Sequence, residues 1–248
     1  MLSVLNVTKR FGGLTALDNC TINVEKKEIC GLIGPNGSGK STLFNVITGY
    51  YPADNGEISY NETHIESMAP YDIINMGISR TFQLPNLFKK MTLMENMLIA
   101  SKAQKGENIW SAWFGLGVKQ QDYENYKKAM DLLEFFNLVQ LRNEYASSIS
   151  FGQQKLLELA RALMTDPEIL LLDEPTGGIN PVLVNKIIES IKEMRDRNIT
   201  FLIIEHNMSV VSRLCDRVYV LDHGKNIAMG TPDEVKTNER VIQDYLGV

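Results

Sequence analysis

The feature that most constrains this chain is the glycine-rich segment GPNGSGKS at residues 34–41. It follows the apolar run Glu28–Ile33 and leads into a helical pattern over Ser41–Thr48, with Gly49 as the expected stop. A strand, a glycine-rich loop and a helix in this order direct backbone N–H groups and a helix N-terminus at phosphate oxygens. This context favours a phosphate-binding loop over a chance glycine-rich turn.

Two side chains of this loop have different expected ligands, a phosphate and a metal ion. Lys40 is placed to reach the β- and γ-phosphates of a nucleotide, and the hydroxyl of Ser41 to ligate Mg²⁺. The residues expected to bind the nucleotide here are Gly34, Pro35, Asn36, Gly37, Ser38, Gly39, Lys40, Ser41 and Thr42.

A second signal is the apolar run Ile169–Leu172, which ends in two acids, Asp173 and Glu174. Such a run is typical of a strand buried on both faces. Asp173 is the candidate residue to hold the water shell of Mg²⁺. Glu174, one residue further on, is the candidate general base for an attacking water. The alternative is that both acids merely solvate a strand end. A phosphate-binding loop in the same chain favours the catalytic interpretation.

Composition excludes several classes of protein. The chain has 248 residues and a net charge of −5, whereas an electrostatic nucleic-acid binder is usually basic, so DNA or RNA is not expected as a partner. Cys20, Cys30 and Cys215 are too few and too scattered for a disulfide framework or a zinc cluster. The N-terminal residues lack a signal-peptide pattern, and no run reaches the roughly 18–20 apolar residues of a membrane span. We expect a soluble protein that reaches a membrane only through a partner.

The order of patterns along the chain predicts an α/β fold with a helical insert. Residues 84–165 contain no convincing strand, and residues 106–117 look irregular. The expected strands are Leu2–Thr8, Cys20–Val24, Glu28–Ile33, Gly56–Tyr60, Ile169–Leu172, Thr200–Ile204 and Val218–Leu221. The expected helices are Ser41–Thr48, Met91–Ala100, Gln121–Phe136, Gln153–Met164, Pro181–Arg197 with Asn180 as N-cap, and a short one that starts at Thr231.

Together these segments resemble the ATP-binding subunits of ABC transporters along essentially the whole chain. Phe11 lies 29 positions before Lys40, where that family places an aromatic residue that stacks on adenine. Gln83, in Arg80-Thr-Phe-Gln, matches the glutamine that senses Mg²⁺ and the γ-phosphate. His206, at the end of the expected strand Thr200–Ile204, matches the switch histidine of that family. Taken singly, each of these three residues has a structural explanation, and only their ordered set indicates a site.

The family signature LSGGQ is matched by ISFGQ at residues 149–153. Ile149 stands for Leu and Phe151 for the first Gly, which is similar to variants in amino-acid importer ATPases. The resemblance implies that Ser150, Gly152 and Gln153 approach the triphosphate bound by a second subunit. Another departure lies in the D-loop, residues 177–180, where Asn180 stands for the more frequent Asp.

The resemblance implies an α/β fold: a P-loop NTPase core of the RecA-like type with an antiparallel β subdomain and an inserted α-helical subdomain. Within a single ABC ATPase domain, 1–248, the expected parts are 1–83 and 166–230 for the core and the β subdomain, 84–165 for the helical subdomain, and 231–248 for a C-terminal helical tail. Glu174, His206 and Gln83 are the expected catalytic residues. Ser41, Gln83 and Asp173 are the expected metal ligands.

The implied activity is ATP hydrolysis that powers an ABC membrane importer, with ATP and Mg²⁺ as cofactors. The implied partners are transmembrane permease subunits, a second ABC ATPase subunit in a homo- or heterodimer, and indirectly an extracytoplasmic substrate-binding protein. The expected location is peripheral, at the cytoplasmic face of the cell (inner) membrane.

Within this family, four features resemble the branched-chain amino-acid importer ATPases. They are FGGLTAL at 11–17, RTFQ at 80–83, the ending YLG at 245–247 and a helical insert at about 101–120. Lipopolysaccharide-export and urea-import ATPases are the near alternatives. A soluble ABC ATPase of a cytosolic assembly machine would share every nucleotide motif, whereas a P-loop kinase would lack the signature and His206. Three alternatives are open for the aromatic segment Ile109–Phe114: packing on the helical subdomain, contact with membrane subunits or the bilayer, and disorder.

Overall fold

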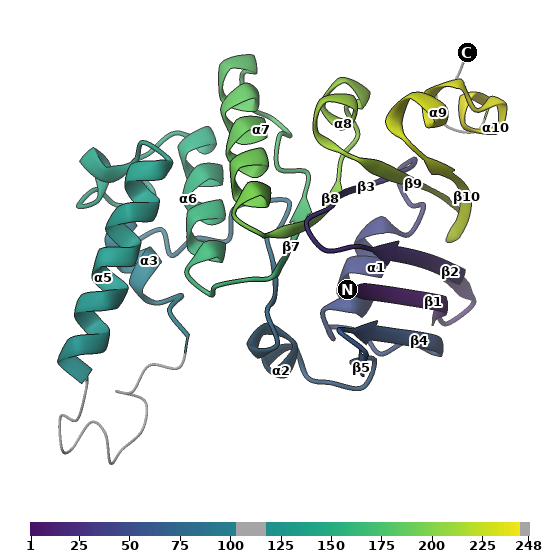
Figure 1. Ribbon diagram of the computed structural model, residues 1–248, viewed down its shortest axis with the longest axis horizontal. Coiled ribbons are helices and arrows are strands. Elements are labelled where there is room, and N and C mark those ends of the chain that lie inside the picture. The colour runs from purple at the N-terminus through teal and green to yellow at the C-terminus, as the bar shows by residue number, and fades with distance from the viewer. Residues whose placement is uncertain (103–117, 244–248) are drawn as a thin grey trace. The chain divides into compact units, whose positions relative to one another are not determined.

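The computed structural model describes residues 1–102 and 118–243 (Figure 1). The expected irregular segment at 106–117, the aromatic segment Ile109–Phe114 and the ending at 245–247 therefore lie outside the described residues. Within the described ranges, no helix is both long and apolar enough to cross a bilayer. The described residues form two compact units: those of 1–83, 168–177 and 184–248 make the first, and those of 84–167 and 178–183 make the second.

The first unit contains two sheets, and the expected α/β fold is confirmed. The antiparallel sheet has the order β2-β1-β4-β5, and the larger sheet has the order β10-β9-β3-β8-β7-β6. The antiparallel strands are β1 (Leu2–Phe11), β2 (Leu14–Val24), β4 (Asn55–Tyr60) and β5 (Thr63–His64). The larger sheet consists of β3 (Ile29–Ile33), β6 (Ile78–Arg80), β7 (Ile169–Asp173), β8 (Thr200–Ile204), β9 (Arg217–Asp222) and β10 (Lys225–Gly230).

The central strands of the larger sheet run parallel, because helices connect them across its faces. Every residue of β3, β7 and β8 is buried, as their continuous apolar runs require. Only β10 runs antiparallel to its neighbour. The strands β6 and β10 were not expected from the sequence, and β1 and β2 extend well beyond the predicted runs.

The helix that follows the glycine-rich loop, α1 (Lys40–Ile47), packs between the two sheets. Its buried Phe44 and Ile47 belong to one core cluster with Ile22 of the antiparallel sheet and Leu32 of the parallel sheet. Figure 1 shows α8 (Met208–Leu214) and α9 (Pro232–Thr237) on the opposite side of the larger sheet. The remaining helices of this unit are α2 (Pro70–Asn75), α10 (Glu239–Val241) and most of α7 (Pro181–Asp196), whose first residues belong to the second unit.

The second unit is helical in its described part. Its helices α3 (Leu93–Leu98), α5 (Val118–Phe135) and α6 (Phe151–Leu163) pack on one another, with a short 3₁₀ helix at Val139–Leu141. Capping boxes begin α3 at Thr92 and α6 at Ser150. Because of the cap at Ser150, α6 begins two residues earlier than the expected start at Gln153. No strand occurs among the described residues of this unit, as the sequence predicted.

Candidate functional site

The glycine-rich loop is shaped by close backbone neighbours. Gly34 has φ +148°, and a Cβ there would lie 2.0 Å from the carbonyl oxygen of Leu221. Gly39 has φ +105°, and a Cβ there would lie 2.5 Å from the carbonyl oxygen of Ala16. Residues with a side chain rarely adopt such φ angles. The loop therefore needs glycine at both positions for steric reasons as well as for its conformation.

The turn between β9 and β10 braces this loop, which the sequence did not indicate. The Gly224 N–H donates to the carbonyl oxygen of Ser38 at 2.9 Å, and the Asp18 N–H donates to the carbonyl oxygen of Gly224 at 2.9 Å. Through Gly224 the loop is joined to β2 as well as to the larger sheet. An ordinary hairpin glycine carries no local signal of such a role.

Lys40, the first residue of α1, lies over the loop that it terminates. Its Nζ donates to the carbonyl oxygens of Gly34 at 2.9 Å and Pro35 at 2.8 Å, and lies 3.3 Å from Ser38 Oγ. Burial lowers the pKa of Lys40, and the carboxylates of Glu174 and Asp173 act in the opposite direction. The ammonium group is thus held by three oxygens of the loop, in a position where it could also bind a phosphate oxygen.

Glu174 is the residue on which the predicted catalytic side chains converge. Its Oε1 lies 2.9 Å from His206 Nε2, and its Oε2 accepts a hydrogen bond from Gln83 Nε2 at 3.1 Å. Glu174 has φ +48°, and its N–H donates to the carbonyl oxygen of Ile204 at 3.0 Å. A left-handed backbone in a residue other than glycine is uncommon and concentrates at functional sites.

Asp173 lies one residue earlier, at the buried end of β7. Burial raises the pKa of its carboxyl, and the guanidinium of Arg80, with NH2 3.7 Å from Oδ2, opposes that rise. The Asp173 N–H donates to Thr81 Oγ1 at 3.4 Å. The segment that carries Gln83 is therefore attached to β7, the strand that ends at Asp173 and precedes Glu174.

Lys40, Gln83, Glu174 and His206 line one cavity of about 530 Å³ in the first unit, whereas Asp173 is not among its lining residues. Phe11, at its rim, is 40 % exposed, and its ring meets that of Tyr51 edge-on at 5.2 Å between centroids. His223, which the sequence did not single out, also lines it. The lining comprises Phe11, Leu14, Thr15, Ala16, Asn36, Gly37, Gly39, Lys40, Ser41, Thr42, Gln83, Glu174, Ile204, His206 and His223.

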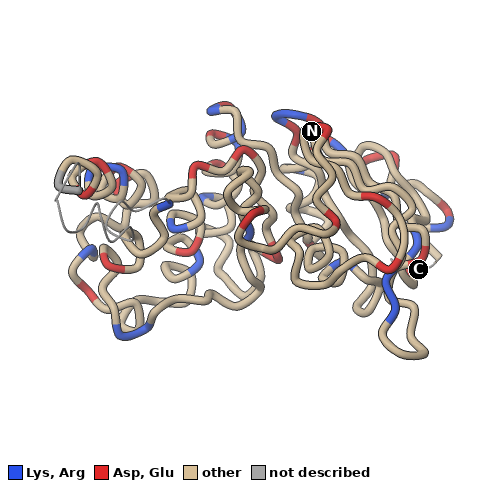
Figure 2. Tube along the Cα trace, turned by 90° about the horizontal axis from the view of Figure 1, so that it is seen from below, with Lys and Arg blue, Asp and Glu red and all other residues tan. Residues whose placement is uncertain are grey.

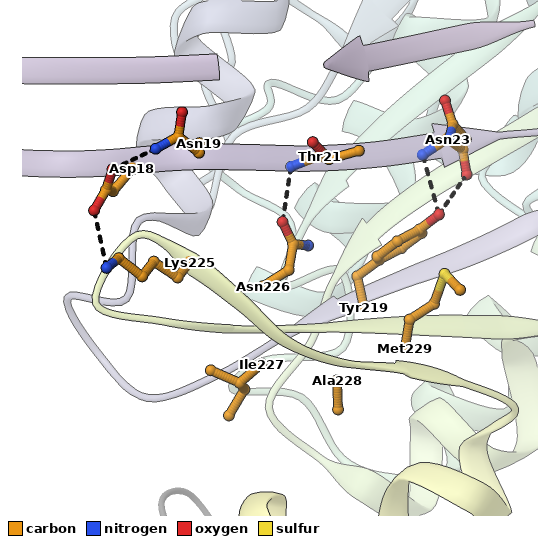
Figure 3. Close-up of a pocket in the computed structure, with 10 residues that line it drawn as sticks. All are labelled: Asp18, Asn19, Thr21, Asn23, Tyr219, Lys225, Asn226, Ile227, Ala228 and Met229. Carbon is orange, nitrogen blue, oxygen red and sulfur yellow. Dashed lines mark hydrogen bonds and ion pairs between the residues drawn. The ribbon is translucent and has the colours of Figure 1, made fainter. Parts of the chain in front are cut away.

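A larger cavity, of about 680 Å³, lies between β2 and β10 (Figure 3). Its polar side chains join the two strands: Asn226 Oδ1 accepts from the Thr21 N–H at 2.7 Å, and Lys225 lies 3.1 Å from Asp18. None of the predicted site residues lines it. Chemistry, and not volume, therefore identifies the candidate site.

The signature residues lie in the second unit. Ser150 caps α6: its Oγ accepts from the Gln153 N–H at 3.3 Å, and its own N–H donates to Gln153 Oε1 at 2.9 Å. Gly152 is buried, and a Cβ there would lie 2.0 Å from Leu183 Cδ2. The glycine of the signature is therefore also required by packing, which the sequence did not reveal.

Charge and metal-ligand patterns agree with a nucleotide site. Figure 2 shows acidic and basic residues interspersed along the trace of each unit, unlike the basic clusters typical of nucleic-acid binding. In the ranges that the structure describes, no group of three or more His, Cys, Asp or Glu side chains could hold a metal ion by itself.

Comparison with known proteins gives consistent similarities. The family model described as ABC transporter matches residues 17–177. The probable branched-chain amino acid transport ATP-binding protein LivG of Archaeoglobus fulgidus is 41% identical over 100% of this chain and 95% of its own length. The high-affinity branched-chain amino acid transport ATP-binding protein LivG of Escherichia coli K12 is 40% identical over 100% of this chain and 98% of its own.

Solved structures agree with these relatives. An ATP-binding cassette of an ABC transporter in its ADP conformation superposes with a TM-score of 0.86 at 38% identity, over 100% of this chain and 99% of the other. A dimeric cassette in a post-hydrolysis state, bound to ADP and phosphate, gives a TM-score of 0.78 at 26% identity, over 94% of this chain and 99% of the other. This chain belongs to the ABC transporter family and is one of its ATP-binding, ATP-hydrolysing cassettes.

Proposed function

We propose that this chain is the ATP-hydrolysing subunit of an ABC importer for branched-chain or related amino acids. The names of its full-length relatives support the transported class. One observation carries the catalytic part. His206 and Gln83 contact the two carboxylate oxygens of Glu174, in the cavity that the phosphate-binding loop lines.

In this proposal Glu174 is the general base. Its carboxylate takes a proton from a water whose oxygen bonds to the γ-phosphorus, while the bond from that phosphorus to the β–γ bridging oxygen breaks, leaving ADP and phosphate. His206 and Gln83 hold Glu174 in place by their contacts to its two oxygens. Lys40 and the loop N–H groups stabilise the negative charge on the phosphates. Phe11, at the rim, is placed to stack on the adenine ring.

The residues present fit Mg²⁺ as the cofactor. Ser41 would supply a hydroxyl, Asp173 a carboxylate and Gln83 an amide oxygen, all of them hard oxygen donors. Mg²⁺ characteristically takes few protein ligands and completes its shell with phosphate oxygens and water. Its role when bound would be to neutralise charge on the β- and γ-phosphates.

The signature implies that two such chains act together. Ser150, Gly152 and Gln153 belong to a different unit from the P-loop, and a related cassette is dimeric with ADP and phosphate bound. We propose that they complete the triphosphate site of a second ATPase subunit. A monomer would then bind ATP and hydrolyse it poorly. Analytical ultracentrifugation of the Glu174→Gln variant should show a dimer with MgATP and a monomer without it.

The proposed partners are permease subunits, and the proposed location is peripheral at the cytoplasmic face of the membrane. To test this, the tagged chain is purified from detergent-solubilised membranes and its partners are identified by mass spectrometry. Two polytopic permeases, together with a second ATPase of this family, are expected. Lipopolysaccharide-export components or urea permeases would reassign the substrate. Soluble partners alone would contradict the transporter and leave the ATPase.

A further inference from the structure

Arg80, the last residue of β6, joins two elements of the nucleotide site. Its side chain is 8% exposed. NH1 donates to Asn45 Oδ1 at 2.6 Å and lies 3.3 Å from Thr48 Oγ1; Asn45 belongs to α1 and Thr48 is the C-cap of that helix. NH2 lies 3.7 Å from Oδ2 of Asp173, the last residue of β7. One guanidinium therefore connects the helix of the phosphate-binding loop to β7, the strand that ends at Asp173 and precedes Glu174.

Three aromatic rings surround the same guanidinium. Its carbon lies 4.9 Å from the ring centroid of Phe82 and 5.8 Å from those of Phe44 and Tyr50. Rings at these distances attract a cation and restrict the plane of the guanidinium. The side chain is thus fixed both by hydrogen bonds and by its faces.

Stability alone does not account for this arginine. Burial lowers the pKa of Arg80, and its Nε has no hydrogen-bond partner in the part of the chain that the structure describes. An apolar residue of similar volume often stabilises an interior as well as a buried ion pair does, or better. The buried ion pair of Arg80 and Asp173 is better explained by the orientation that it imposes on the two side chains.

We propose that Arg80 is a positioning residue of the nucleotide site: it sets the Asp173 carboxylate relative to Ser41 by tying β7 to α1. Ser41 lies four residues before Asn45, on the same face of α1. Mg²⁺ demands near-ideal octahedral geometry, so the spacing of donors on two different elements must be held closely. The inference rests on the proposed roles of Asp173 and Ser41.

The test measures metal binding without turnover. Mn²⁺ replaces Mg²⁺, ADP is the nucleotide, and electron paramagnetic resonance gives the Mn²⁺ affinity of the ADP-loaded protein. Arg80→Met is expected to weaken Mn²⁺ binding about 10–100-fold, the usual effect of losing a group that orients a metal ligand. The affinity for ADP in EDTA should stay within about twofold, because Arg80 does not line the cavity. The Mn²⁺ affinity of Arg80→Lys should lie between those of the wild type and Arg80→Met, since one ammonium cannot hold all three partners.

Matched variants separate the possible outcomes. Arg217→Met removes another arginine that pairs with an acid, Glu28 at 2.8 Å, and lies outside the cavity, so Mn²⁺ binding should not change. An equal loss in Arg217→Met, or unchanged Mn²⁺ binding with only a lower Tm in Arg80→Met, would overturn the proposal. If Arg80→Met fails to fold, Asn45→Ala takes its place, because it removes the Arg80 contact on α1. Asn45→Ala must then weaken Mn²⁺ binding, and wild-type Mn²⁺ affinity in that variant would overturn the proposal.

Asp173→Asn tests the proposed function separately. It should abolish most of the Mn²⁺ affinity. If Asp173→Asn binds Mn²⁺ like the wild type, the proposed metal site is wrong. Weak binding in Asp173→Asn together with wild-type binding in Arg80→Met would leave the metal site standing and reject only the role of Arg80.

Discussion

The Nε2 atom of His206 lies 2.9 Å from Oε1 of Glu174. The two residues follow β8 and β7, which are neighbours in register, with Asp173 opposite Ile204. Buried Glu205 adds a second link, because its Oε1 accepts hydrogen bonds from the N–H of Thr176 at 3.1 Å and from its hydroxyl at 2.6 Å. The contact between Glu174 and His206 therefore follows from the pairing of two parallel strands.

His206→Ala is expected to lower kcat by about 10²-fold or more, the scale for losing one preorganised polar contact at a reacting centre. Nucleotide affinity should change little, because the lost contact is to Glu174 and not to the phosphate-binding loop. Steady-state phosphate release and ADP titration measure the two quantities. His64→Ala is the control, since His64 is exposed and lies outside the cavity. Wild-type kcat in His206→Ala would remove this residue from the mechanism.

Lys40→Ala is expected to weaken ATP binding about 10–100-fold, because charge-assisted hydrogen bonds contribute roughly 1.5–3 kcal/mol. Isothermal titration calorimetry measures the affinity. Lys26→Ala makes the same chemical change at an exposed position outside the cavity and should bind ATP like the wild type. Unchanged affinity in Lys40→Ala would contradict the assigned loop.

Gly152→Ala is expected to destabilise the chain by about 1–3 kcal/mol, the usual effect of overpacking. The reason is the 2.0 Å approach of its new Cβ to Leu183 Cδ2. Leu183→Ala makes room, so the double variant should be more stable than the sum of the two single effects predicts. Urea unfolding of all four proteins completes this cycle. Strict additivity would show that the two side chains do not meet.

The cysteines are expected to resist thiol reagents in the native protein. Burial raises the pKa of Cys20 and of Cys215 to about 12, and that of Cys30 also rises well above its usual value. A thiol with such a pKa is ionised on the order of 10⁻⁵ at pH 7, and only the thiolate reacts. Because ionisation increases with pH, labelling by a disulfide reagent should keep accelerating up to pH 10. Rapid labelling of one native cysteine at pH 7 would contradict this burial.

What the sequence could predict of the candidate site rests on short contiguous patterns. The loop around Lys40, and the two acids at the end of β7, each combine a strand, a turn and polar residues within a few positions, so the local pattern predicts them. β6 escaped prediction because three residues ending in Arg80 have no periodicity, and its pairing with β7 alone makes it a strand. β10 mixes Lys, Asn and Gly in the same way and is fixed by its hairpin with β9.

Tertiary contacts account for the rest. The signature could be located by its order in the chain, but the packing of Gly152 on Leu183 depends on how two distant segments fold together. Likewise, Arg80 looked like a family marker beside Gln83. Its position between α1 and β7 comes from long-range pairing, which no local spacing encodes.

The central claim is that Glu174 is the general base of an ATPase, and Glu174→Gln tests it most directly. Amide and carboxylate have nearly the same shape, so ATP binding should persist while kcat falls about 10²–10⁴-fold. Glu189→Gln, on the exposed face of α7, is the matched control and should keep wild-type turnover. Phosphate release and ATP binding are measured on the same preparations. Retained binding with lost turnover is the predicted result, and near-wild-type turnover in Glu174→Gln would contradict the account.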